Sequence, residues 1–297
     1  MSLPVLNPGD AIGLVSPAGA VRREQVQPGI DYLTSLGYIC KLGQHAFSDN
    51  GLTSAPVERR LEDLHTFVAD EEVKVIWALR GGYGSIQLLD RLEYGLFRGH
   101  PKILVGFSDI TALQWALYAR LGLPSLSGLT LTTQTRPENR YVSVGLEILS
   151  GRRKALVARD LSGESVQAFR SGEASGTLMA GTLSMICTLC GTPFWPKAEP
   201  IILALEDVNE PLYRIDRYFQ QLRLMGFWEN VAGLLLGKFL LDETEQDVLP
   251  LITPLVGPEV PIVYNLPYGH FSNALPFPSG VAARLQAEPF RLEWKGS

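Results

Sequence analysis

Short apolar runs alternate with helical patterns over the first 130 residues of the chain. An apolar run closed by Gly or Pro is typical of a strand buried on both faces, and apolar residues three or four positions apart are typical of a helix that packs on it. Because strands joined through helices run parallel, this half predicts a parallel sheet flanked by helices. Ser54 is the predicted N-cap of the second helix. The predicted strands cover 11–19, 38–43, 73–79 and 102–107, and the predicted helices cover 21–36, 57–68, 85–92 and 109–120.

The pattern changes after residue 135. Residues 136–172 are richer in charge, Gly and Ser, and they predict a connecting segment with one helix near 141–150. From 173 onward, strands alternate with helices again but are divided more often by Pro and Gly. The sequence therefore predicts an α/β protein with an N-terminal domain over 1–135 and a second α/β domain over 173–297, meeting at a cleft.

Composition is that of an ordinary globular protein and excludes some classes of partner. The 297 residues are 46% apolar and 19% charged, with a formal net charge of −5. Binding to nucleic acid is not expected, because phosphate neutralisation needs clusters of Lys and Arg. The three cysteines form neither a disulfide framework nor a complete zinc set, so no metal is expected. We find neither a signal peptide nor an apolar run of about 18 residues, and we therefore expect a cytoplasmic protein with no membrane partner.

Ser108 marks the point where the predicted strand 102–107 becomes a helix. A residue at such a turn lies at the carboxyl edge of a parallel sheet, where ligands bind in open α/β folds. Free N–H groups of the helix N-terminus, including that of Asp109, can stabilise an oxyanion there. The stretch 106–110, Gly-Phe-Ser-Asp-Ile, resembles a nucleophile elbow but lacks its second glycine. Two interpretations stay open, a nucleophile and a plain helix N-cap.

A glycine-rich loop over 80–84, Arg-Gly-Gly-Tyr-Gly, follows the preceding strand and should lie beside Ser108 on the same sheet edge. Several glycines close together allow the backbone to approach a ligand. The spacing matches neither a dinucleotide-binding fingerprint nor a P-loop. A phosphate cradle, a second oxyanion donor and a simple tight turn all stay open from these residues alone.

His270 and Glu206 are the best candidates for a base and for the group that orients it. The chain has four histidines, and His270 stands apart in a loop with Pro and Gly on both sides. Such loops carry catalytic groups more often than regular elements do. Glu206 lies near the end of the apolar run 201–207 and points into the cleft if it continues the alternation of Ile202 and Ala204. The order serine, glutamate, histidine is that of α/β-hydrolases, which is weak evidence because triads recur in several orders. A histidine bonded to the backbone and a carboxylate facing water are the alternatives.

Together these segments resemble the serine LD-carboxypeptidases, also called muramoyltetrapeptide carboxypeptidases, and the related microcin-immunity peptidases. The motifs that carry the resemblance run nearly from end to end: PGDAIGLVSPAG, IWALRGGYG, VGFSDITAL, LCGTPFWP, LALEDVNEPLYRIDRYFQQL and LPYGHFSNALPFPSGVAARL. The resemblance implies an N-terminal parallel α/β domain and a C-terminal α/β domain with a small β-sheet, with the active site in the cleft between them. It also implies a homodimer.

The resemblance implies a role for each candidate residue. Ser108 is the implied nucleophile, Glu206 and His270 complete a triad, and backbone amides of Asp109 and Gly82 form the implied oxyanion hole. Three residues of the glycine loop are candidates for substrate binding: Arg80, Gly81 and Tyr83.

The implied reaction is hydrolysis of the L,D-peptide bond to the terminal D-alanine of murein tetrapeptides, as in cell-wall recycling, through an acyl-enzyme and without a cofactor. Two alternatives stay open: a peptidase of the same family that cleaves a peptidyl-nucleotide antibiotic, and a nucleotide-binding module without catalysis. The chain departs from the family pattern at 127–129, where Ser-Gly-Leu replaces His-Gly-Pro, and at 180–183, where Ala-Gly-Thr-Leu replaces Gly-Gly-Asn-Leu. Neither departure is expected to touch the triad, and both concern the cleft more than the reaction class.

Overall fold

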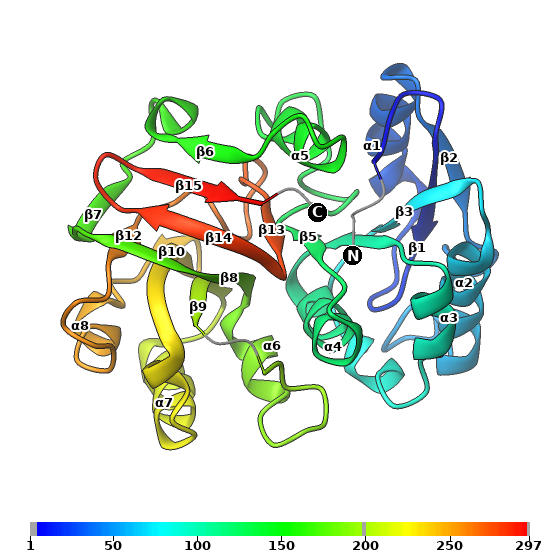
Figure 1. The fold of residues 1–297 in the computed structure, drawn as a ribbon. Helices are drawn as coiled ribbons and strands as arrows, with labels where there is room; N and C mark the ends of the chain where they lie inside the picture. The colour runs from blue at the N-terminus through cyan, green and yellow to red at the C-terminus, as the bar shows by residue number, and fades with distance from the viewer. Residues whose placement is uncertain (1–4, 198–199, 296–297) are drawn as a thin grey trace.

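Two β-sheets with helices packed against them make up the computed structural model, which describes residues 5–197 and 200–295 (Figure 1). The strands of the first sheet from β5 to β2 are parallel, and only β13 at its edge is antiparallel. The first half of the chain therefore folds as the predicted parallel sheet. The six strands lie in the order β13 (Phe277–Ser279), β5 (Ser125–Ser127), β4 (Ile103–Gly106), β3 (Val73–Ala78), β1 (Ala11–Val15) and β2 (Ile39–Leu42).

The second sheet has nine strands among the described residues. Eight lie along one path, in the order β6 (Ala155–Val157), β15 (Arg291–Trp294), β14 (Val281–Gln286), β8 (Glu173–Thr182), β9 (Ile201–Val208), β10 (Val231–Leu241), β12 (Ile262–Tyr264) and β7 (Gln167–Arg170), and β11 (Thr244–Glu245) pairs with β10. The four central strands, β8, β9, β10 and β12, are parallel. This sheet is larger than the small sheet that the resemblance implies, because the expected connecting segment 136–172 supplies β6 and β7 at its two edges.

Helices cover both faces of the first sheet. Successive strand residues point to opposite faces, so Val75 and Trp77 of β3 join a core with side chains of α1 and α5, whereas Ile76 and Ala78 join one with side chains of α2, α3 and α4. None of the described helices is both long and apolar enough to span a membrane. The helices are α1 (Arg23–Ser35), α2 (Val57–Ala69), α3 (Tyr94–Gly99), α4 (Thr111–Leu121), α5 (Val142–Leu149), α6 (Leu183–Thr188), α7 (Leu212–Leu224) and α8 (Leu249–Ile252).

Near its C-terminal end the chain crosses from the second sheet to the first and back. Strand β12 belongs to the second sheet, β13 pairs with β5 at the edge of the first, and β14 returns to the second directly after Gly280, whose φ is +82° (Figure 1). The segment 265–276 between β12 and β13 therefore has one end fixed in each sheet. His270 lies on this segment, between the two halves of the fold.

Two local predictions are wrong. Ser54 does not cap α2, because Pro56 is the N-cap and the Ser54 hydroxyl instead donates a hydrogen bond of 2.5 Å to the carbonyl oxygen of Ser16. The helix predicted over 85–92 is only a 3-10 helix, η1 (Ser85–Leu88), and α3 follows it. In both places, contacts between segments distant in the chain outweigh the structure that the local sequence favours, an N-cap at Ser54 and a helix over 85–92.

Candidate active site

Ser108 lies directly after β4, at the carboxyl end of a parallel strand, and opens the short 3-10 helix η2 (Ser108–Ile110). Its φ is +63°, in the left-handed region that residues with a Cβ seldom occupy. Strain of this kind persists at functional turns when the surrounding structure enforces it. Phe107, not Ser108, is the N-cap of η2, and none of the described side chains caps it. The partly exposed Ser108 therefore does not behave as a plain helix cap.

The glycine loop 80–84 packs directly on the turn that carries Ser108. A Cβ on Gly81 would lie 2.7 Å from the Cβ of Ser108 and 3.0 Å from its hydroxyl oxygen, which only a glycine permits. The next residue, Gly82, is exposed and has a φ of +103°, a conformation that favours glycine. The loop is pinned on its other side by Gly19, whose N–H donates a hydrogen bond of 2.9 Å to the carbonyl of Gly81. Close approach of two backbones explains these glycines.

The side chains of Asp109 and Arg60 hold this loop, a role that could not be predicted from the sequence. The N–H of Ser85 donates a hydrogen bond of 2.8 Å to Oδ2 of Asp109. Nη1 of Arg60 donates to the carbonyls of Pro17 and Gly84, at 2.9 and 2.8 Å. Both side chains are buried, and burial raises the pKa of Asp109 while its hydrogen bonds and the charge of Arg60 oppose that rise. The sequence indicates this role only by placing a charged residue, Arg60, among the apolar positions of α2.

Glu206 and His270 meet at the carboxyl ends of β9 and β12. Nδ1 of His270 lies 2.7 Å from Oε2 of Glu206, and the Thr182 hydroxyl donates a hydrogen bond of 2.6 Å to Oε1. The Glu206 side chain is fully buried, whereas that of His270 is 22% exposed. A carboxylate accepting from Nδ1–H fixes the tautomer in which Nε2 is free to accept a proton. Thr182 belongs to one of the two departures from the family pattern, and the expectation that neither touches the triad is wrong here, because its hydroxyl bonds Glu206.

Gly237 of β10 allows the segment 265–276, which carries His270, to reach Glu206. Strand β10 lies between β9 and β12, so the chain after β12 has to pass over it. A Cβ on Gly237 would collide with the carbonyl oxygen of Tyr268, which accepts a hydrogen bond of 2.8 Å from the N–H of Lys238. The sequence signal was a glycine inside a strand pattern, which often marks close approach of another backbone.

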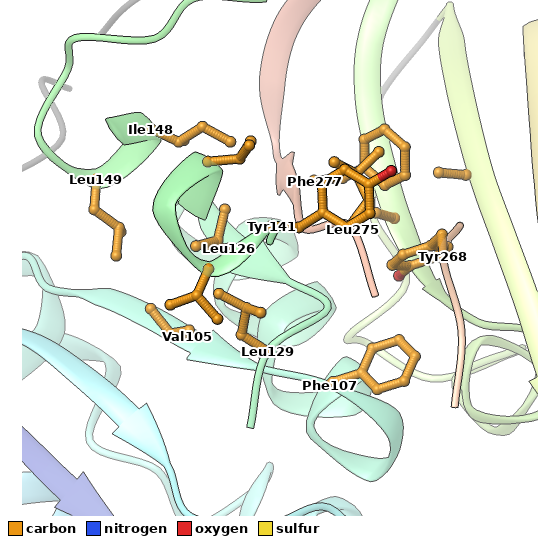
Figure 2. Packing of buried hydrophobic residues seen from close by; sticks show 14 of the residues in the cluster. Val105, Phe107, Leu126, Leu129, Tyr141, Ile148, Leu149, Tyr268, Leu275 and Phe277 are labelled. Atoms are coloured by element: carbon orange, nitrogen blue, oxygen red, sulfur yellow. The ribbon is translucent and has the colours of Figure 1, made fainter. Parts of the chain in front are cut away.

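Phe107 packs against both the imidazole of His270 and the ring of Tyr268. The ring centroids lie 4.7 Å apart for the first pair and 5.5 Å apart for the second, and Figure 2 shows the Phe107 and Tyr268 rings side by side. Tyr268 is fully buried, with its hydroxyl 2.8 Å from Oγ of Ser127. Phe107, the residue before Ser108, therefore packs against the imidazole of His270 and links the two parts of the site.

The charges around His270 favour its protonated form. Burial alone lowers the pKa of this imidazole, but the charge and hydrogen bond of Glu206, together with the charge of Asp207, raise it above its ordinary value. Asp207, the next residue along β9, points to the opposite face of the strand and accepts a hydrogen bond of 2.7 Å from the N–H of Ser184. Burial and the charge of Glu206 raise the pKa of Asp207 to about 7.

Arg80 and Tyr83 lie on the exposed side of the glycine loop. Nη1 of Arg80 donates a hydrogen bond of 2.9 Å to the carbonyl of Ala20, and both side chains, with Gly82, line a groove of about 710 Å³. A larger cavity, of about 810 Å³, lies at the β6–β15–β14 edge of the second sheet and contains none of the candidate residues. Within 5–197 and 200–295, no three His, Cys, Asp or Glu side chains gather as a metal site.

Residues 12–128 match the family model for the LD-carboxypeptidase N-terminal domain, and residues 175–285 match that for the LD-carboxypeptidase C-terminal domain. The chain belongs to the LD-carboxypeptidase family. The enzyme class predicted from the sequence, a serine-type LD-carboxypeptidase, is confirmed at this level, and so is the resemblance on which it rests.

Named relatives of this LD-carboxypeptidase agree with the family assignment. It is 31% identical to the murein tetrapeptide carboxypeptidase of Pseudomonas aeruginosa, over 95% of this chain and 94% of that protein. The solved structure of a muramoyltetrapeptide carboxypeptidase from Oxalobacter formigenes is 26% identical, with a TM-score of 0.81 over 96% of this chain and 98% of the other. The structure of MccF in complex with glutamyl sulfamoyl guanosine, at 20% identity, has a TM-score of 0.89 over 100% of this chain and 98% of the other, which shows a shared fold.

Proposed function

We propose that this LD-carboxypeptidase removes the terminal D-alanine from murein tetrapeptides through a triad of Ser108, His270 and Glu206. The observation that carries the proposal is the 2.7 Å contact of the buried Glu206 carboxylate with Nδ1 of His270, in a loop that packs against the neighbour of Ser108. The murein substrate is supported by the Pseudomonas aeruginosa relative, named for that activity.

In the proposed reaction, Nε2 of His270 accepts the proton of the Ser108 hydroxyl as its oxygen attacks the carbonyl carbon of the penultimate residue. The N–H groups of Asp109 and Gly82 stabilise the negative charge on the carbonyl oxygen. His270 then donates its proton to the amine of D-alanine as the peptide bond breaks. Water, deprotonated by the same imidazole, releases the acyl group from the serine.

The two parts of the chain divide this work. Residues 1–135 supply the nucleophile and the oxyanion donors, and 173–297 supply Glu206 and His270. We assign 136–172 to the connection, although its strands extend the second sheet. The cytoplasmic location and the homodimer stay predictions.

Mass spectrometry of D-alanine release from purified murein tetrapeptide tests the function. We expect release by the wild type, and a loss of at least about a thousandfold in Ser108→Ala. Ser143→Ala is the matched control, because this exposed serine lies at the start of α5 and its hydroxyl donates a hydrogen bond to the carbonyl of Arg140. Full release by Ser108→Ala would contradict the proposed nucleophile. Binding of a nucleotide, with no release by the wild type, would favour the non-catalytic alternative, and cleavage of an aminoacyl-nucleotide instead of murein would favour the antibiotic peptidase.

A further inference from the structure

A groove of about 710 Å³ opens beside the proposed nucleophile, on the first half of the molecule. We call it the arginine groove, defined by Arg22, Arg23, Phe47, Arg80, Gly82 and Tyr83 along its walls. One side is formed by the N-terminal end of α1 and another by the glycine loop. The third side is formed by residues 47–52, which lie between β2 and α2. Its volume lies in the range of sites that bind a whole small molecule.

The arginine groove lies next to Ser108, with the glycine loop between them. Gly82 lines the groove, and the residue before it, Gly81, lies so close to Ser108 that a Cβ would lie 3.0 Å from the hydroxyl oxygen. A substrate whose carbonyl oxygen bonds the N–H of Gly82 is therefore held at a residue that also lines this groove.

Three guanidinium groups give the groove its positive charge. Arg22, Arg23 and Arg80 form no salt bridge with any carboxylate of the part of the chain that the structure describes. Arg23 is held over the ring of Phe47, with its guanidinium carbon 4.5 Å from the ring centroid.

Two carboxylates also line the groove, and they do not cancel this charge. Oδ1 of Asp49 accepts a hydrogen bond of 2.7 Å from the N–H of Gly51, and Glu24 lies in the exposed first turn of α1. Three arginines against two carboxylates leave an excess of positive charge, to which the helix N-terminus of α1 adds. The groove thus has the charge suited to a peptide that carries carboxylates.

The leaving D-alanine is a single small residue and would fill little of this volume, whereas the acyl side of a murein tetrapeptide is long and acidic. It carries the free α-carboxylate of a γ-linked D-glutamate, and a further carboxylate when its diamino acid is diaminopimelate rather than lysine. We infer that the arginine groove binds the acyl side of the substrate through these carboxylates and so selects acidic over amidated peptides. This inference rests on the proposed function and names which part of the substrate sets specificity.

Calorimetric binding to the Ser108→Ala protein tests the groove without turnover. The two probes are L-Ala-γ-D-Glu-diaminopimelate-D-Ala and the same peptide with the D-glutamate α-carboxylate and the side-chain carboxylate of diaminopimelate amidated. We expect the amidated peptide to bind about tenfold more weakly, because it loses charge-assisted hydrogen bonds. Adding Arg23→Gln should weaken binding of the acidic peptide and leave the amidated one nearly unchanged, so that the difference between the two becomes smaller. Arg22→Gln and Arg80→Gln are measured in the same way.

Arg223→Gln is the matched control, since this exposed arginine lies at the end of α7, on the other half of the molecule (Figure 1). It should keep the full difference between the two peptides. The inference is overturned if the parent protein binds both peptides equally, or if none of the three groove variants reduces the difference. D-alanine release by the wild type is measured in parallel, so that failure of the proposed function is seen separately from failure of the groove.

Discussion

The Thr182 hydroxyl donates a hydrogen bond of 2.6 Å to Oε1 of Glu206, on the side of the carboxylate away from His270. The N–H of Thr182 in turn donates to Oγ1 of Thr111, at 3.2 Å, at the start of α4. Because α4 follows η2 directly, Thr182 links the carboxylate of one half of the site to the helix behind Ser108 in the other. This residue stands where the family pattern has asparagine.

Replacing Thr182 with valine should lower kcat about tenfold and leave KM nearly unchanged. Valine keeps the shape but removes a hydrogen bond to a buried carboxylate, so that Glu206 is no longer held in the orientation that His270 needs. Steady-state kinetics of D-alanine release measure both constants. Thr182→Ser, which keeps the hydroxyl, should recover most of the activity. An equal loss in the serine and valine variants would show that packing, not the hydrogen bond, matters at this position.

The pH profile of kcat/KM should fall on its acidic side with an apparent pKa above the ordinary histidine value. His270 accepts a proton only when neutral, and its surroundings raise its pKa, so activity is lost as pH falls through that raised value. Glu206→Gln removes the charge that raises the pKa, and the acidic limb should therefore move to lower pH. We expect kcat to drop by about four orders of magnitude in the same variant. A limb that stays at the same pH in Glu206→Gln would mean that another group controls it.

Asp207 should make the protein less stable as pH rises toward neutrality. Its carboxyl has a pKa of about 7 in the folded protein against 3.8 as the ordinary value, so the native state holds a proton that the unfolded state has released. The stabilisation that this extra proton gives is complete below the unfolded-state pKa of 3.8. It is lost as pH rises through the folded-state pKa of about 7. Urea unfolding between pH 4 and 8 should show the free energy of unfolding falling over this window, and Asp207→Asn should flatten that slope.

Asp90→Asn, at an exposed position, serves as the control for this slope. Asparagine at 207 still offers one oxygen to the N–H of Ser184, which keeps this hydrogen bond at the start of α6. If the free energy of unfolding of the Asp207→Asn protein falls with pH as steeply as that of the wild type, a group other than Asp207 holds the extra proton of the native state.

The parts of the site that depend on local pattern could be predicted, and the parts that depend on long-range pairing could not. An apolar strand running into a helix was enough to single out Ser108 as a candidate, and strand alternation was enough to point Glu206 into the cleft rather than Asp207. The antiparallel pairing of Phe277 with Ser127 is different, since these residues are far apart in the chain and each short strand resembles a loop in the sequence. The role of Thr182 could not be predicted for the same reason, because a hydroxyl at the end of a strand does not indicate which carboxylate it will bond.

Gly81→Ala should lower the activity of the enzyme strongly while leaving it folded. The added methyl group would lie 2.7 Å from the Cβ of Ser108 and 3.1 Å from the carbonyl oxygen of Phe107, so the turn that carries the nucleophile has to shift. A misplacement of about 1 Å at a nucleophile costs about a hundredfold in kcat/KM.

Gly95→Ala is the matched control, because a Cβ there meets no heavy atom within 4 Å and lies in helix α3. Alanine in a helix is about 1 kcal/mol more favourable than glycine, so this variant should be as active as the wild type and at least as stable. Thermal melting and D-alanine release, measured on both variants, separate a displaced nucleophile from a general loss of structure. Wild-type activity in Gly81→Ala would mean that the glycine loop does not lie against Ser108 during turnover, and the assignment of Gly82 as an oxyanion donor would fail with it.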